Sequence, residues 1–154
     1  MIQIKNAVEL QKMRKVNAIS AAALKYGGEH IEPGMTTAEL DKIIYDFIVR
    51  HGARPNFLHL YGFPATACIS VNDTVIHGIP NRQQQIRPGD IVSIDTGCKI
   101  DGFNGDNACT YACGKIDLEA QRLLDVTKES LHRGIEMARG GNRVGDIGHA
   151  VQSY

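Results

Sequence analysis

The sequence predicts an α+β fold in which helices pack on an antiparallel sheet. Near both ends of the chain, apolar residues recur at the three- and four-residue spacing of amphipathic helices. In the middle they alternate with polar residues as in strands, and an Asp-Gly pair marks a tight hairpin turn. Because 154 residues suffice for one hydrophobic core, residues 1–154 are expected to form a single domain.

The first helix is expected at residues 7–26. Asn6 can cap its first turn, and Glu9, three residues further on, completes a capping box. The pair Gly27-Gly28 is expected to end this helix, because glycine is common just past a helix C-terminus.

A second helix is expected after Thr36. Thr36 and Glu39 form another capping box, and Gly52 and Pro55 set the far limit of the helix. The apolar residues between these limits recur at helical spacing and predict an amphipathic helix: Leu40, Ile43, Ile44, Phe47 and Ile48.

Strands are expected in the middle of the chain. Residues 66–71 and 74–76 are interpreted as short strands around a turn. Residues 91–100 and 103–113 flank the pair Asp101-Gly102, which a two-residue hairpin loop favours. These two longer strands are therefore predicted to form an antiparallel hairpin.

Two more helices are expected after the strands. Asp117 can cap a helix that runs to about Ala138, and a shorter helix is expected to start near Gly145 and to be cut off at Tyr154. The longer helix is expected to turn its apolar side inward, with Ala120, Leu123, Leu124, Thr127, Leu131 and Ile135.

The hairpin predicts a pair of neighbouring carboxylates. If the Asp-Gly pair forms the loop, Gly97 lies opposite Asp106, and Asp95 lies opposite Ala108. Asp95 and Asp106 then share one face as diagonal neighbours, with Cα atoms roughly 7–8 Å apart. Their charges repel, and a divalent cation would relieve that repulsion. Two solvated surface carboxylates are the alternative, and a register shifted by one residue would separate them.

His77 and the cysteines are the other candidate groups. A neutral imidazole at His77 can bind a metal, carry a proton or orient a substrate carbonyl, and a hydrogen-bonded structural role is the alternative. The cysteines are interpreted as reduced, buried apolar residues, because the hairpin separates the pairs that could bind zinc and no base is evident for a nucleophile. They are Cys68, Cys98, Cys109 and Cys113.

Composition argues against several classes of protein. Lys+Arg and Asp+Glu both number 17, so no basic surface for a nucleic acid or a membrane is predicted. No apolar run approaches the roughly 20 residues that span a bilayer, and the first residues show no export signal. A cytoplasmic location is expected.

Three blocks of sequence resemble the type I methionine aminopeptidases in order and spacing. They read CISVNDTVIHGIP at residues 68–80, GDIVSID at residues 89–95 and DGFNGD at residues 101–106. The resemblance implies the pita-bread fold, whose two pseudo-symmetric halves hold a dinuclear metal site, and this chain is similar to the first half. It also implies removal of N-terminal methionine from peptides, including nascent chains at the ribosome.

The resemblance assigns roles to the charged candidates. Asp95 matches a metal ligand, and Asp106 matches the ligand that bridges two divalent cations, for which cobalt, manganese, iron, zinc and nickel are all compatible. His77 matches the catalytic histidine that contacts the substrate. The family's remaining ligands, one histidine and two glutamates, lie beyond Tyr154. The truncated chain is therefore expected to bind metal weakly and to be inactive alone.

The resemblance also implies a methionine pocket. Phe63 and Cys68 match positions that line it, whereas Phe57 and Leu60 stand at rim positions that often hold cysteine and tyrosine in relatives. Asn104 stands where many relatives have histidine.

Two other expectations follow from the same sequence. The chain can be a non-catalytic pita-bread module that binds peptides or proteins, although retention of both aspartates argues against this alternative. A half-fold also exposes apolar surface, so two copies can pair as a homo-oligomer and bring four aspartates together, with partial unfolding or aggregation as the alternative.

Overall fold

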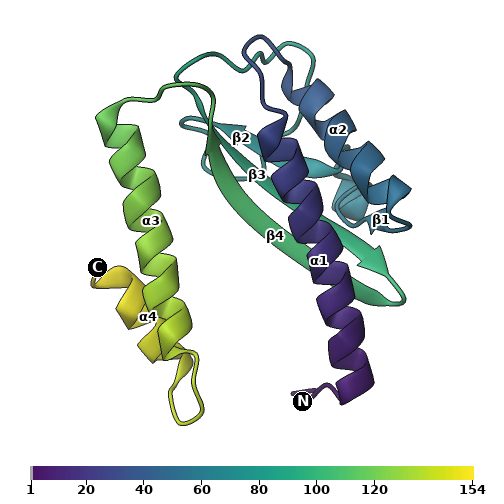
Figure 1. Ribbon diagram of the computed structural model, residues 1–154, viewed down its shortest axis with the longest axis vertical. Helices are drawn as coiled ribbons and strands as arrows, with labels where there is room; N and C mark the ends of the chain where they lie inside the picture. The colour runs from purple at the N-terminus through teal and green to yellow at the C-terminus, as the bar shows by residue number, and fades with distance from the viewer. Residues whose placement is uncertain (1) are drawn as a thin grey trace. The chain divides into compact units, whose positions relative to one another are not determined.

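A computed structural model describes residues 2–154, which form two compact units. The first unit ends at Lys115, and the second runs from Ile116 to Tyr154. The elements of the first unit are α1 (Ala7–Glu29), α2 (Thr37–Arg50), β1 (Arg54–Pro55), the 3₁₀ turn η1 (Leu60–Gly62), β2 (Ala67–Val71), β3 (Ile91–Ile100) and β4 (Phe103–Ala112) (Figure 1). The predicted α+β class, with helices on an antiparallel sheet, is confirmed.

β3 is the central strand of the sheet. β4 pairs with β3 over its whole length, while β1 and β2 pair with different stretches of β3, and all pairs are antiparallel. Asp101 and Gly102 have φ values of 53° and 83°, as a two-residue hairpin turn of the primed type requires. The predicted register is confirmed, because Gly97 lies opposite Asp106 and Asp95 lies two residues further along, opposite Ala108.

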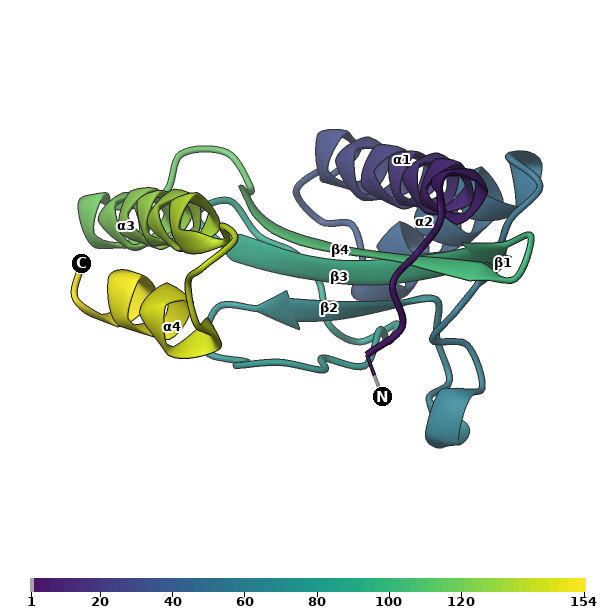
Figure 2. The same ribbon diagram turned by 90° about the horizontal axis from the view of Figure 1, so that it is seen from below.

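The hydrophobic core lies between the two helices and one face of the sheet. Figure 2 shows α1 and α2 on the same side of β3 and β4. Fully buried side chains from each layer meet there: Val16, Leu40, Ile44, Ile48, Ile69, Val92 and Ile94. Because side chains alternate along a strand, Asp95 faces away from this core.

Both predicted capping boxes are present, but α1 is longer than expected. Asn6 with Glu9 caps α1, and Thr36 with Glu39 caps α2. The pair Gly27-Gly28 does not end α1, which continues to Glu29. These glycines instead allow close packing, because a Cβ at position 27 would lie 2.8 Å from the side chain of Ile44.

The expected strand at residues 74–76 is wrong. Asn72 turns the chain with φ 52°, and the Thr74 N–H donates to the Val71 carbonyl. The chain returns to β2 only at Gly78, whose carbonyl accepts from Ile69 N–H at 2.9 Å. Residues 74–76 therefore have no strand beside them in the described chain, and they form an exposed loop.

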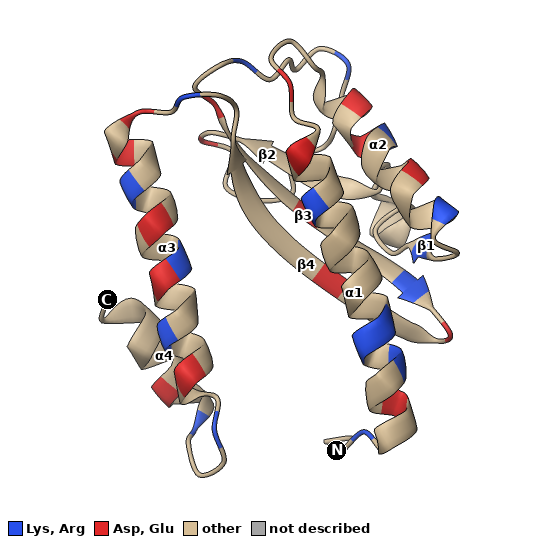
Figure 3. Cartoon of the chain, viewed as in Figure 1, with Lys and Arg blue, Asp and Glu red and all other residues tan. Residues whose placement is uncertain are grey.

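The second unit consists of α3 (Leu118–Met137) and α4 (Val144–Gln152). Asp117 caps α3 as predicted, by accepting from Ala120 N–H at 2.7 Å. The helices approach closely at Gly134, where a Cβ would lie 2.8 Å from Val151. Basic and acidic residues are interleaved along the sequence of α3 (Figure 3).

The expected inward side of α3 is wrong for four residues, because Thr127 is exposed as well as three of the apolar residues. Leu123, Leu131 and Ile135 are 56%, 57% and 58% exposed. Only the nine-residue α4 packs on α3 within this unit, and it contacts the helix around Gly134. One short helix is too small to cover the apolar stripe of a 20-residue helix.

Candidate active site

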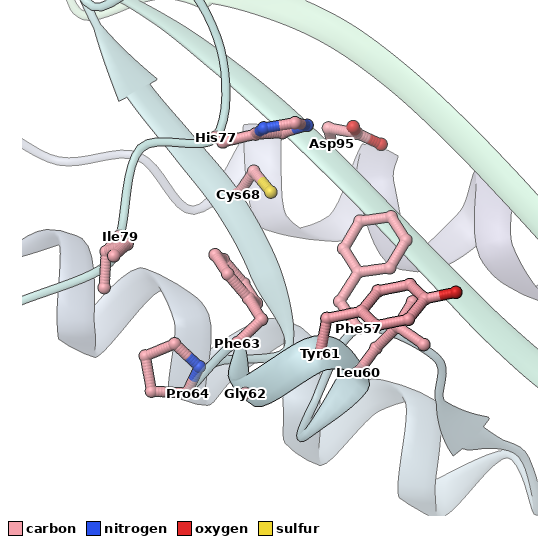
Figure 4. A pocket seen from close by; sticks show the side chains of 10 residues that line it. All are labelled: Phe57, Leu60, Tyr61, Gly62, Phe63, Pro64, Cys68, His77, Ile79 and Asp95. Atoms are coloured by element: carbon pink, nitrogen blue, oxygen red, sulfur yellow. The ribbon is translucent and has the colours of Figure 1, made fainter.

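A cavity of about 510 Å³ lies on the face of the sheet that turns away from the helices. Its lining is mostly apolar and aromatic, with one imidazole, His77, and one carboxylate, Asp95, beside a thiol and a phenol. The lining residues are Phe57, Leu60, Tyr61, Gly62, Phe63, Pro64, Cys68, His77, Ile79 and Asp95 (Figure 4). Six of the seven residues that the sequence nominated lie here, and Asp106 is the exception.

The apolar side of the cavity comes from a tightly folded segment between β1 and β2. Tyr61 and Gly62 have positive φ, and short-range hydrogen bonds from Leu60 N–H to Phe57 O and from Phe63 N–H to Leu60 O close the turn. The segment is held on β3 by Asn56, whose N–H donates to Gly97 O at 2.9 Å. Phe57, Leu60 and Phe63 consequently gather on one side of the cavity.

Asp95 and Asp106 form the carboxylate pair that the hairpin register predicts. Burial raises the pKa of Asp95, and the negative charge of Asp106 and a hydrogen bond between the two carboxyl groups raise it further. The charge of His77 has the opposite, smaller effect on the pKa of Asp95. The two carboxylates are therefore close enough to compete for a proton, and an added positive charge would favour their ionised forms.

His77 lines the cavity next to Asp95. Its side chain is exposed, and its backbone has φ 57°, in the left-handed region that residues with a Cβ rarely adopt. Figure 4 shows its imidazole and the carboxylate of Asp95 pointing toward one another, with Cys68 beside them. A ligand in the cavity would therefore meet an imidazole and a carboxylate at the same end.

Cys68 is a neutral thiol in the wall of the cavity. Burial raises its pKa to about 11, with further contributions from the charges of Asp95, Asp106 and Asp41. A thiol of this pKa is not a nucleophile at neutral pH, which agrees with the apolar role expected for it.

All four cysteines are free, as expected, but one is not buried. Cys68, Cys98 and Cys113 are buried, whereas Cys109 is exposed. The expectation of a buried residue is wrong at Cys109 because it lies on β4, which pairs with β3 alone and has its other edge open within this unit.

Several residues of the site were missed from the sequence. Asp41 on α2 accepts hydrogen bonds from Thr66 N–H and Ala67 N–H, at 2.9 Å and 2.8 Å, and so fixes the start of β2. Burial raises the pKa of Asp41 despite these bonds. The sequence feature that could have indicated Asp41 is a carboxylate placed between the core positions Leu40 and Ile44. The other missed residues are Tyr61, Gly62, Pro64 and Ile79.

The donor set suits a divalent cation but is incomplete within the described chain. Residues 2–154 contain no group of three or more His, Cys, Asp or Glu side chains arranged to hold a metal ion. Asp95 and Asp106 supply carboxylate oxygens, which hard and borderline cations prefer. Burial and, second to it, the negative charge of Asp106 raise the pKa of Asp95, and a nearby cation would oppose both effects.

Within residues 2–154, no helix combines the length and the apolar character needed to cross a membrane.

Comparison with known proteins places this fold and site in a family. The profile of metallopeptidase family M24 matches residues 11–154. The chain is 47% identical to the methionine aminopeptidase of Clostridium perfringens over its whole length, which is 61% of that relative. It superposes with a TM-score of 0.97 on methionine aminopeptidase from Rickettsia prowazekii, at 39% identity, covering 100% of this chain and 62% of that one.

A more distant structural likeness is Escherichia coli aminopeptidase P. There the TM-score is 0.84 at 27% identity, with 96% of this chain and 32% of that chain covered. The fold and the carboxylate pair at its site are those of a metallopeptidase. The chain belongs to metallopeptidase family M24, and the pita-bread fold expected from the sequence is confirmed. The chain spans about 61% of the length of the curated relatives it matches.

Proposed function

We propose that this chain forms part of a metal-dependent methionine aminopeptidase, an enzyme that removes N-terminal methionine from peptides in the cytoplasm. The single observation that carries the proposal is the apolar cavity that ends at His77 and Asp95. The greater identity to methionine aminopeptidases than to aminopeptidase P favours methionine as the residue released.

The cavity suits a methionine side chain in size and character. Its volume of about 510 Å³ lies within the range of small-molecule sites. Phe57 and Phe63 offer aromatic rings, against which a thioether sulfur makes favourable contacts. Leu60 and Cys68 add apolar surface without an ionised group, because the thiol of Cys68 stays neutral.

Asp95 in the wall of the cavity, together with the neighbouring Asp106, would hold the metal. Asp95 and Asp106 are the groups of this chain that we assign to two divalent cations, with cobalt, manganese, iron, zinc and nickel as candidates. When bound, the cations supply Lewis-acid activation for hydrolysis of the peptide bond. Asp95 binds a cation in its ionised form, and its raised pKa means that acid weakens metal binding.

His77 would act on the substrate rather than on the metal. Its exposed imidazole lies beside the carboxylate end of the cavity, where the first peptide bond of a bound methionyl peptide would lie. An imidazole there can donate a hydrogen bond to the carbonyl of that bond and orient it. We therefore assign His77 to substrate binding and catalysis.

The isolated chain is proposed to be inactive. Two carboxylates are fewer ligands than a firmly held divalent cation needs, and the described residues offer no third one beside them. A module that binds methionyl peptides without cleaving them is the second candidate, and the same incomplete ligand set favours it.

A chimera tests the proposed function. Residues 1–154 would replace the matching 61% of the Clostridium perfringens enzyme, and methionine release from a Met-Ala-Ser peptide would be measured with Mn(II) or Co(II). We expect release by the chimera, loss of release in Asp106→Ala and Asp95→Ala, and no change in Asp73→Ala, which alters an exposed loop carboxylate. Tight peptide binding without release by a folded chimera would favour the binding module instead.

A further inference from the structure

His77 is carried by a loop that contacts the rest of its unit at two ends. At one end Asn72 receives a hydrogen bond from Ile91 N–H at 3.0 Å and donates one to Asp90 at 2.8 Å. At the other end lies Gly78. In the described chain, residues 73–77 between these ends make one hydrogen bond, from Thr74 N–H to Val71 O. The position of His77 therefore depends on how Gly78, the next residue, is held on β2.

Gly78 is fixed on β2 by two hydrogen bonds, which we call the Gly78 contact. Its carbonyl accepts from Ile69 N–H at 2.9 Å, and its own N–H donates to the hydroxyl of Ser70 at 3.1 Å. The backbones lie so close that a Cβ on Gly78 would overlap the Ile69 carbonyl. Of the two bonds, only the one to Ser70 uses a side chain.

The conformation of His77 needs such support. Its φ of 57° is unfavourable for a residue with a Cβ, and such backbone persists only where neighbouring contacts fix it. The side chains of residues 73–77 are exposed, so packing of the loop does not supply that support. The Gly78 contact, one residue away, supplies the support for the backbone of His77.

Among the described residues, the hydroxyl of Ser70 has one hydrogen-bond partner, the Gly78 N–H. Ser70 lies on the cavity side of β2, two residues from Cys68, and is only 4% exposed. Ser93, opposite it on β3, has a hydroxyl that is paired with Thr110 at 2.8 Å. The two hydroxyls thus have separate partners, and Ser70 is the one that contacts the His77 loop.

We propose that Ser70 is a positioning residue: its hydroxyl holds the Gly78 amide and thereby fixes the imidazole of His77 beside Asp95. Ser70 touches neither substrate nor metal. The importance of this placement for peptide hydrolysis rests on the proposed function, whereas the placement itself does not.

Amide hydrogen exchange and histidine NMR spectra of the 154-residue chain test the placement. In Ser70→Ala we expect exchange at Gly78 to quicken about tenfold, as loss of a buried hydrogen bond predicts, and the ring signals of His77 to shift. Ser70→Thr, which keeps the hydroxyl, should restore both signals. Ser20→Ala is the matched control, because Ser20 is also buried and donates to one backbone carbonyl, that of Thr96, on the opposite face.

Kinetics of the chimera test the consequence. There Ser70→Ala should lower kcat about tenfold with a KM changed less than about threefold, and Ser70→Thr should recover the rate. Ser70→Cys, which fills the same space with a weak acceptor, should behave as Ser70→Ala and serves if the alanine variant does not fold.

Two results would overturn the proposal. One is Gly78 exchange and His77 signals in Ser70→Ala that match those of Ser20→Ala. The other is a chimera whose rate is unaffected by Ser70→Ala although it is lost in His77→Ala. An unsubstituted chimera with no activity would count against the proposed function and leave the exchange experiment to decide the role of Ser70.

Discussion

The contact between α1 and β4 predicts a large effect from adding one methyl group. A Cβ at Gly105 would lie 2.7 Å from the carbonyl oxygen of Val16 and 3.0 Å from the Cα of Asn17. These atoms belong to the helix backbone, so no side chain can rotate away. For ordinary contact at 3.4 Å, α1 must move by roughly 0.7 Å in a closely packed interior.

The size of the effect follows from two opposing terms. Overpacking of this kind costs about 1–3 kcal/mol. Replacing glycine lowers the entropy of the unfolded chain, which raises the free energy of unfolding by about 0.4–1 kcal/mol. Gly105→Ala should therefore lower the free energy of unfolding by about 1–2 kcal/mol. It should also weaken metal binding, because Asp106 is the next residue on β4.

Urea unfolding followed by far-UV circular dichroism measures this change. Asn104→Ala is the neighbouring control, since it truncates an exposed side chain to the same methyl group one residue away and should change stability by less than about 0.5 kcal/mol. If Gly105→Ala is as stable as Asn104→Ala, α1 does not lie against the β4 backbone as described.

Three further predictions concern ionisation, thiols and assembly. Burial raises the pKa of Asp41, so its protonated form is favoured by folding, and the stability it contributes is present below pH 3.8 and lost as the pH rises through the raised pKa. Urea midpoints should show wild type losing stability relative to Asp41→Asn over that rise, and a constant difference would contradict this. Cys109 is the one exposed cysteine of the described residues, so a thiol reagent should modify one group rapidly in the native protein and none in Cys109→Ser. Exposed apolar side chains on α3, including Leu123 and Leu131, predict self-association, and light scattering that shows only monomer at micromolar concentration would refute it.

The hairpin was predictable because its determinants are local. The Asp-Gly turn fixes the register of β3 and β4, and the register alone puts Asp95 and Asp106 on one face. The helix starts were predictable for the same reason, since a capping box is a contact between residues three positions apart.

Features that depend on distant residues were not predictable. Gly27 and Gly28 have the composition of a helix end, yet Ile44 and Tyr111 pack against them and α1 continues. Residues 74–76 have the composition of a strand, but no neighbouring strand in the described chain pairs with them.

The candidate site divides in the same way. Spacing indicated the carboxylates, whereas only the family resemblance indicated the grouping of Phe57, Leu60 and Phe63. That grouping depends on the tight turn at Tyr61 and Gly62, which residue spacing does not reveal. Asp41 was missed because its hydrogen-bond partners, Thr66 and Ala67, lie 25 and 26 residues away in the sequence.

Titration of the 154-residue chain with Mn(II), followed by electron paramagnetic resonance, tests the central claim most directly. The account predicts weak binding in roughly the millimolar range, as an incomplete set of ligands allows. Asp106→Asn should abolish this binding, and Asp73→Asn should leave it unchanged. Binding that survives in Asp106→Asn, or a complete lack of binding by the unsubstituted chain, would contradict the assignment of Asp95 and Asp106 as a metal-binding pair.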